Sequence, residues 1–301
     1  MKYLSKLTLL LFIGLTIYNP IKAQEDWRSI ISLDSLNTDG YTNATFKTTR
    51  LINAQSLETV KANTLDFRIS HRFGSVSDGI HTLYGLDLAS DIRFAFEYGI
   101  SKQLTIGVSR SRIDENLEGL IKFRLLRQTE DGKVPLAITL FANTALTPKN
   151  DFTPTQDYAV FAHRMSYTYQ AIIGRKFSKD FSLQFMPTLV HRNFIANPAD
   201  KNDLISIGVG GRLKLTKRSA IVIDYFNNVN PMNNKRSSVS GVTYYNPLGI
   251  GWEIETGGHV FTIMFSNAAG IIENEFIPNT TESWLKKGFK FSFDISRNFA
   301  L

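Results

Sequence analysis

Charged side chains recur at every second position within otherwise apolar stretches, and the two halves of the chain differ in sign. The early stretches are mainly basic and the late ones mainly acidic. The candidates for lining an interior are Arg68, Arg72, Arg93, Lys122, Arg124, Asp224, Glu253, Glu255 and Asp294. On opposite arcs of a hollow, such groups would set up a transverse field that guides small polar solutes. The alternative is that they pair and brace the wall, since early acids such as Asp66 and Glu97 blur the separation.

No catalytic arrangement stands out in the sequence. A hydrolase on a barrel wall needs a serine and a histidine two residues apart on one strand face, and none of the five histidines has a serine at that spacing. Asp78, His81 and Asp87 share one loop, where a protease-like set could form, but solvated loop residues explain them better. The chain has no cysteine and no histidine pair with metal-ligand spacing, so we expect no enzyme, no metal and no cofactor.

The elements that must position these charges are strands, because apolar and polar residues alternate with a period of two. The alternation occurs in twelve stretches. They are 65–70, 92–98, 104–109, 121–126, 136–140, 165–174, 181–189, 205–215, 221–225, 248–255, 261–266 and 289–296. The Gly208–Gly211 stretch lies within one of them with no following helix, so its glycines indicate bending or close approach of another backbone. Pro187 interrupts another strand, where we expect a bulge or kink.

The connections between the twelve stretches fall into two classes. Five are short and six, on the opposite side, are longer with one exception. The short ones are 99–103, 128–133, 177–180, 216–219 and 256–258, and the others are 75–90, 111–116, 145–162, 194–202, 228–243 and 268–286. Short and long connections alternate strictly, as periplasmic turns and external loops do in outer-membrane barrels.

The distribution of charge favours a membrane barrel over a soluble β-protein. Twelve strands enclose a space that side chains from one face do not fill, since about eight strands are already just filled. Charges in a dry core would cost several kcal/mol each unless paired, whereas the apolar face carries no charge at its centre. The sequence therefore predicts an all-β fold: an antiparallel transmembrane β-barrel of about twelve strands, with its apolar face toward outer-membrane lipid.

The first residues predict export. Two lysines precede a twelve-residue apolar run, 7–18, which is too short to span a membrane, and a cleavage site follows at Ala23. We therefore expect a signal peptide (1–23), a periplasmic or lumen-inserted segment (24–63) and the barrel (64–301). Residues 45–52 alternate weakly, enough for a thirteenth strand, but an odd strand count makes this the less favoured interpretation. Cleavage would lower the net charge from +7 to +4, and this small, unclustered excess gives no support for nucleic-acid binding.

Several stretches together resemble one known family. They are TFKTTRLIN (45–53), SLET (56–59), ISHRFG (69–74), FEYG (96–99) and GLIKFRLLRQ (119–128). These resemble the family called domain of unknown function 5777, β-barrel proteins of Gram-negative bacteria, over roughly residues 40–301. The resemblance implies a barrel in the outer membrane of the bacterial envelope, but no activity and no site residues.

Two functional hypotheses follow from the sequence. The first is a narrow pore or binding barrel for small polar solutes, motivated by the charged interior. The second is a non-conducting structural barrel that binds partners through its long external loops, above all 145–162 and 268–286.

Overall fold

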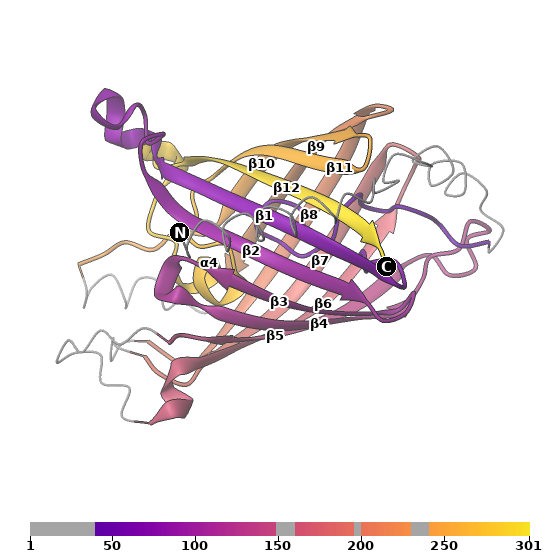
Figure 1. Ribbon diagram of the computed structural model, residues 1–301, viewed down its shortest axis with the longest axis horizontal. Helices are drawn as coiled ribbons and strands as arrows, with labels where there is room; N and C mark the ends of the chain where they lie inside the picture. Colours follow the sequence, from indigo (N-terminus) through magenta and orange to yellow (C-terminus); the bar gives the residue numbers. More distant parts are fainter. Residues whose placement is uncertain (1–39, 149–159, 196–199, 230–240) are drawn as a thin grey trace, which may run out of the picture. The chain divides into compact units, whose positions relative to one another are not determined.

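The computed structural model describes residues 40–148, 160–195, 200–229 and 241–301, which belong to one compact unit (Figure 1). In this part of the chain, strands adjacent in sequence pair antiparallel, and β1 pairs with β12 to close a barrel. The strands are β1 (Thr64–Ser75), β2 (Ala89–Gly99), β3 (Leu104–Ser111), β4 (Leu117–Leu126), β5 (Ala137–Leu146), β6 (Met165–Lys176), β7 (Phe181–Arg192), β8 (Asp203–Thr216), β9 (Ser219–Asn228), β10 (Leu248–Thr256), β11 (His259–Ser266) and β12 (Lys290–Ala300). The predicted twelve-stranded antiparallel barrel is confirmed.

The helices are short. They are the 3-10 helices η1 (Val76–Thr82), η2 (Ile113–Glu115), η3 (Phe161–Arg164) and η4 (Trp284–Lys286), and the α-helix α4 (Glu273–Asn279). No helix among the described residues has the length and apolar character needed to cross a membrane. In Figure 1, η1 projects beyond one end of the barrel and α4 lies among the strands.

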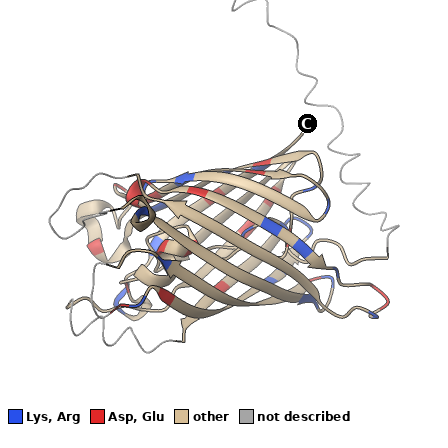
Figure 2. Cartoon of the chain, turned by 90° about the horizontal axis from the view of Figure 1, so that it is seen from below, with Lys and Arg blue, Asp and Glu red and all other residues tan. Residues whose placement is uncertain are grey.

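The two faces of the strands differ as the alternation predicts. Large apolar side chains point outward and stay exposed, such as Phe94 and Phe96 at 46% each and Val108 at 61%. Their neighbours in sequence, such as Arg93 and Glu97, point inward and are at most 1% exposed. Most strand positions carry no charge (Figure 2). An outward apolar face suits contact with lipid, where a central lysine or arginine would cost about 2–4 kcal/mol.

The chain ends its strands at the same end of the barrel as it begins them. The backbone N–H of Leu301 donates to the carbonyl of Asn63 at 3.0 Å, directly before β1. The short connections lie at this end as well, and one of the two that have only two residues is Gly257–Gly258, whose φ angles of 38° and 104° favour glycine. This is the arrangement of periplasmic turns in outer-membrane barrels, so we call this end the periplasmic end and the other the outer end.

Pro187 does not produce the predicted bulge. Pro187 pairs in unbroken register with Ile207 of β8. On the other side, the pairing of β6 with β7 keeps one register from Ser166–Arg192 to Lys176–Ser182, but Met186 and Pro187 make no pair with β6. The missing N–H of proline therefore removes a rung of the ladder without inserting a residue.

Candidate functional site

The lumen is occupied by a segment of the chain's own N-terminal region. Residues 41–63, here called the inner hairpin, enter and leave at the periplasmic end. Tyr41 bridges Thr129 in the β4–β5 connection, and the Asn63 N–H donates to the Gly99 carbonyl at 2.9 Å. Between these points the chain turns at its tip, where the Leu51 N–H donates to the Ala54 carbonyl at 2.9 Å. The tip residues 51–54 are at most 3% exposed.

Asp224 of β9 holds this tip. One carboxylate oxygen accepts the backbone N–H groups of Ile52, Asn53 and Ala54 at 3.1, 2.6 and 2.8 Å, and the other accepts the Asn53 side-chain amide at 2.7 Å. Asp224 is 1% exposed, so its charge is compensated by these four donors. Hydrogen bonds to an ionised group are roughly twice as strong as neutral ones. The turn therefore has a dedicated anchor on the wall.

Lys122 of β4 binds the two stems of the inner hairpin, which are the residues before and after its tip. Its ammonium donates to the carbonyls of Thr49, Ser56 and Glu58 at 2.6, 3.2 and 3.3 Å. The side chain is fully buried, and an ammonium has three protons to donate. A single wall charge thus joins both stems of the inner hairpin.

Asn53 links the tip to a third part of the wall. Its side-chain oxygen accepts Arg72 of β1 at 2.6 Å and the Ser266 hydroxyl at the end of β11 at 3.0 Å. Arg72 also donates to the carbonyl of Ala268 at 2.9 Å. With its amide given to Asp224, Asn53 connects β1, β9 and β11 through one side chain.

The connection between β11 and β12 enters the lumen from the outer end and meets the inner hairpin. We call residues 267–283 the outer segment; they include α4. Arg50 of the inner hairpin donates to the Ile271 carbonyl at 2.8 Å and pairs with Glu273 at 3.1 Å. Both charged side chains are at most 1% exposed. The expectation that 268–286 extends outward as an external loop is therefore wrong for much of its length, because its apolar residues find a buried surface inside.

Apolar packing holds the outer segment in place. Phe276 meets Phe226 of β9 edge to face, with ring centroids 5.1 Å apart, and Ile277 belongs to the same buried cluster. Glu275 lies at the outer part of α4, where it accepts the amides of Asn116 and Asn279 at 3.1 and 3.2 Å. Burial, reinforced by the nearby Asp114, raises the pKa of Glu275 to about 8, so this carboxyl is protonated at neutral pH.

Wall glycines make room for the apolar side chains of the inner hairpin. A Cβ at Gly249 would lie 2.5 Å from Ile52, and one at Gly210 would lie 2.6 Å from Leu51. Both glycines face inward, on β10 and β8. The sequence predicted bending or close backbone approach for the Gly208–Gly211 stretch, and at Gly210 the structure has the side chain of an inserted segment.

All nine candidate side chains point into the barrel, and six of them contact the inner hairpin. Those six are Arg68, Arg72, Lys122, Arg124, Asp224 and Glu255, with Arg124 bound to Glu58 at 3.0 Å and Glu255 to Lys47 at 2.6 Å. The other three pair along the wall: Arg93 with Glu118 at 2.7 Å, Glu253 with Arg212 at 2.7 Å and Asp294 with Arg68 at 3.8 Å. Among the nine candidates, an early basic and a late acidic residue pair directly at the β1–β12 seam, where Arg68 meets Asp294.

Several residues of the site carry no mark in the sequence. Asn53, Arg50 and Glu273 lie outside the twelve alternating stretches, and their partners are up to 223 residues away. One signal was available: the outer segment contains Ile271, Ile272, Phe276 and Ile277, more apolar side chains than a solvated external loop needs. Such a run indicates burial.

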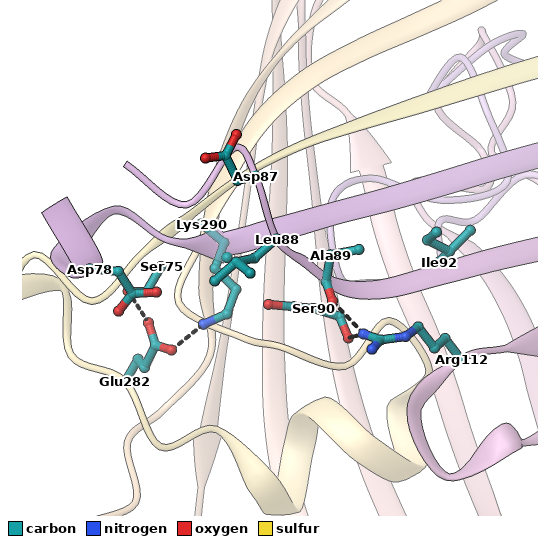
Figure 3. Close-up of a pocket in the computed structure, with 11 residues that line it drawn as sticks. Ser75, Asp78, Asp87, Leu88, Ala89, Ser90, Ile92, Arg112, Glu282 and Lys290 are labelled. Carbon is teal, nitrogen blue, oxygen red and sulfur yellow. Dashed lines mark hydrogen bonds and ion pairs between the residues drawn. The ribbon is translucent and has the colours of Figure 1, made fainter. Parts of the chain in front are cut away.

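A pocket of about 500 Å³ opens at the outer rim, between the start of β2, the start of β12 and the loops beside them (Figure 3). Lys290 pairs there with Glu282, which also accepts the Ser75 hydroxyl at 2.7 Å. Asp78 and Asp87 line this pocket and His81 does not. Among the described residues there is no group of three or more histidine, aspartate or glutamate side chains placed to hold a metal.

Comparison with known proteins gives a family and a set of barrels. The family model described as a membrane-bound beta barrel domain, domain of unknown function 5777, matches residues 46–299. The NanC porin has a TM-score of 0.46 and 8% identity, covering 79% of this chain and 100% of that chain. Omp33, an outer membrane protein of Acinetobacter baumannii, has a TM-score of 0.41 and 10% identity, covering 81% of this chain and 100% of that chain. No curated protein matches the sequence.

Proposed function

The chain belongs to the family of membrane-bound β-barrel domains called domain of unknown function 5777, and on that premise we propose that it is a gated outer-membrane passage for small polar solutes. The inner hairpin closes the lumen at rest. Withdrawal of that hairpin toward the periplasm opens it. The barrel itself stays unchanged in both states.

One observation carries this proposal: wall charges bind the backbone of the inner hairpin. Asp224 and Lys122 are ionisable groups whose partners are N–H and C=O groups of the inserted chain. The buried backbone N–H and C=O groups of the inserted hairpin must have partners, and Asp224 and Lys122 supply them; water can supply both the backbone and the two charged groups when the hairpin is outside. Charged anchors are suited to a lumen that holds the inner hairpin in one state and water in the other.

The route of the chain allows such a withdrawal. Both ends of the inner hairpin lie at the periplasmic end, beside Thr129 and Gly99. The hairpin can leave as it entered, without threading through the barrel. Twelve strands enclose more space than the roughly eight strands that side chains alone can fill, so withdrawal of the hairpin leaves a channel beside the outer segment, which stays in the lumen.

Planar-bilayer conductance tests the proposal. We compare the mature chain with a variant lacking residues 24–62 and with a matched control lacking only 24–39, which keeps the inner hairpin. The proposal expects steady current from the first deletion and brief, rare openings from the other two proteins. Heat-modifiable gel mobility establishes that each barrel is folded. A folded 24–62 deletion that passes no current would refute the passage.

A second function is favoured by a different observation. The connection after β1 exposes several large apolar side chains: Ile80, Leu83, Tyr84 and Leu86, at 64%, 50%, 53% and 43%. Exposed apolar groups gathered in one place indicate a contact surface, so the alternative is a non-conducting barrel that binds a partner outside the cell. Capture of a partner lost in an I80S/L83S/Y84S variant, with no conductance in any deletion, would favour it. Of the two loops first expected to bind partners, 268–286 is largely internal, and 149–159 lies outside the described residues.

We also propose that the protein reaches the outer membrane after cleavage following Ala23, which lies outside the described residues, and that it has no catalytic activity. The first proposal rests on the basic start and the apolar run 7–18. The mass of the purified protein tests it, since a chain beginning at Gln24 is expected. The second is supported by the described histidines: His191, for example, lies between Asp203 and Asn193 at 2.7 and 2.9 Å. Hydrolysis of phospholipid by the pure protein would contradict it.

A further inference from the structure

The interior of the barrel has two arcs of different character. Strands β6 to β9 point both polar and apolar side chains inward, and the apolar ones form one buried cluster with Leu51, Ile52 and Leu57 of the inner hairpin and Phe276 of the outer segment. This apolar arc comprises Ile172, Met186, Val190, Leu204, Val222 and Phe226. Its contacts are the close packing of a protein core, which admits neither water nor a polar solute.

Strands β12, β1 and β2 form a polar arc on another side of the lumen. Their inward side chains fall into rows across the two pairings of β1, each row two residues from the next. The rows are Asp66 with Glu97, Arg68 with Ser296, Ser70 with Arg93 and Asp294, and Arg72 with Asp91 and Ser292. At about 3.3 Å per residue, these four rows extend roughly 20 Å along the strands.

The polar arc carries buried polar atoms that the protein itself does not satisfy. Both carboxylate oxygens of Glu97, one of Asp66, the hydroxyls of Ser70 and Ser292 and one Nη atom of Arg93 lack a hydrogen-bond partner. Each of these side chains is at most 4% exposed. More than nine in ten buried polar groups in proteins have a partner, and leaving one without any costs free energy. The inward side chains of β6 to β9 carry fewer such atoms, one each on Thr168, Gln170, Arg192 and Asn228, so the denser run along the polar arc marks where polar molecules belong.

We propose that solutes cross the barrel along the polar arc once the inner hairpin has withdrawn, while the outer segment keeps the apolar arc sealed. This inference rests on the gated passage proposed above and adds the route and the class of solute. Both signs of charge line the route in near balance, with donors and acceptors in most rows. Such a wall favours small molecules that both donate and accept hydrogen bonds, neutral or zwitterionic, over multiply charged ions.

Cysteine labelling tests the route, because the chain contains no cysteine and each introduced thiol is the only one. We compare Ser70→Cys and Ser296→Cys on the polar arc with Val222→Cys on the apolar arc, in the full-length chain within vesicles. Ser70 and Val222 are 2% and 1% exposed, so static exposure does not distinguish them. The probe is a small, water-soluble methanethiosulfonate, followed by mass spectrometry.

The inference expects both polar-arc thiols to react at least tenfold faster than the thiol at position 222. Equal rates, or faster labelling at 222, would overturn the route. The substitutions change side-chain size little, and heat-modifiable mobility verifies that each variant is folded. Failure of the passage itself reads out separately, as absence of current from the deletion of 24–62.

Liposome swelling tests the class of solute, using the full-length chain with Asp224→Ala to free the inner hairpin. Glycine and glycerol are the zwitterionic and neutral probes, and citrate is the multiply charged one. Entry of glycine and glycerol at rates within about threefold of each other, with citrate at least tenfold slower, is expected. Citrate entry as fast as that of glycine would overturn the assignment.

Discussion

The inner hairpin and the outer segment fill the same lumen and share one apolar cluster, but wall charges make more hydrogen bonds to the backbone of the inner hairpin than to that of the outer segment. Asp224 and Lys122 bind the inner hairpin through seven hydrogen bonds to its backbone and to Asn53. The outer segment is held through Phe276 and Ile277, which pack into the apolar cluster. Water can replace hydrogen-bonding partners at small net cost, but it offers nothing to an exposed phenyl ring. We therefore expect the inner hairpin to move and the outer segment to stay in place.

The largest effect is expected in the outer segment, the part that is expected to stay in place. Phe276→Ala removes a fully buried ring and should lower the free energy of unfolding by about 3–5 kcal/mol. Urea unfolding in detergent micelles measures this change. The control is Leu285→Ala in η4, a side chain 98% exposed, for which a change within about 0.5 kcal/mol is expected. If the free energy of unfolding falls no more at position 276 than at position 285, packing of Phe276 does not hold the outer segment in place.

The next effect concerns the anchor of the tip. Asp224→Ala leaves three backbone N–H groups of the tip without their acceptor, which should weaken docking of the inner hairpin by roughly 3 kcal/mol, about a hundredfold. Hydrogen exchange of the amides of residues 52–54 measures docking. Glu253→Gln is the matched control, because Glu253 is also buried and inward but pairs with Arg212 of the wall. Faster exchange in both variants would mean that the tip has no dedicated anchor.

These predictions also show what sequence reasoning could reach. A strand with one side toward lipid can be predicted from the sequence, because the alternation of apolar and polar side chains involves neighbouring residues. The twelve strands and the inward direction of Lys122 and Asp224 are predicted in this way. What an inward charge faces is not local information. Water and an inserted hairpin demand the same residue types, and Asp224 meets Asn53 across 171 residues. The length of the outer segment predicts an external loop, whereas its apolar residues, such as Phe276 and Ile277, lead it into the lumen.

A smaller effect is expected at the contact between the two segments. Arg50 and Glu273 form a buried pair, and residues in one network typically couple by 0.5–3 kcal/mol. A double-mutant cycle with Arg50→Met and Glu273→Gln, followed by urea unfolding, should give a coupling of about 1–2 kcal/mol. Additive effects within about 0.3 kcal/mol would show that the segments fill the lumen independently.

The last expected effect is a pH dependence at the outer segment. The pKa of Glu275 is raised from 4.5 to about 8 by burial and by the nearby carboxylates of Asp114 and Asp91. The folded state therefore holds this proton more tightly than the unfolded state, so the stabilisation is complete below about pH 4.5 and is lost as the pH rises toward 8. The protection of the amides of residues 273–279, measured relative to their intrinsic base-catalysed exchange rates, should fall over this range. Glu275→Gln keeps the side-chain size without the titration, and exchange that still followed the same pH profile in this variant would assign the effect to another group.

A reversible disulfide between the inner hairpin and the wall tests most directly whether movement of the hairpin opens the barrel. A Cβ at Gly249 would lie 2.5 Å from a side-chain carbon of Ile52, so Ile52→Cys with Gly249→Cys places two thiols in range of a disulfide. In the Asp224→Ala background, bilayer current is measured before and after oxidation and again after reduction. Current is expected when the thiols are reduced and no current when they are joined, and dithiothreitol is expected to restore the current. The same current in both states, with the disulfide established by mass, would contradict it.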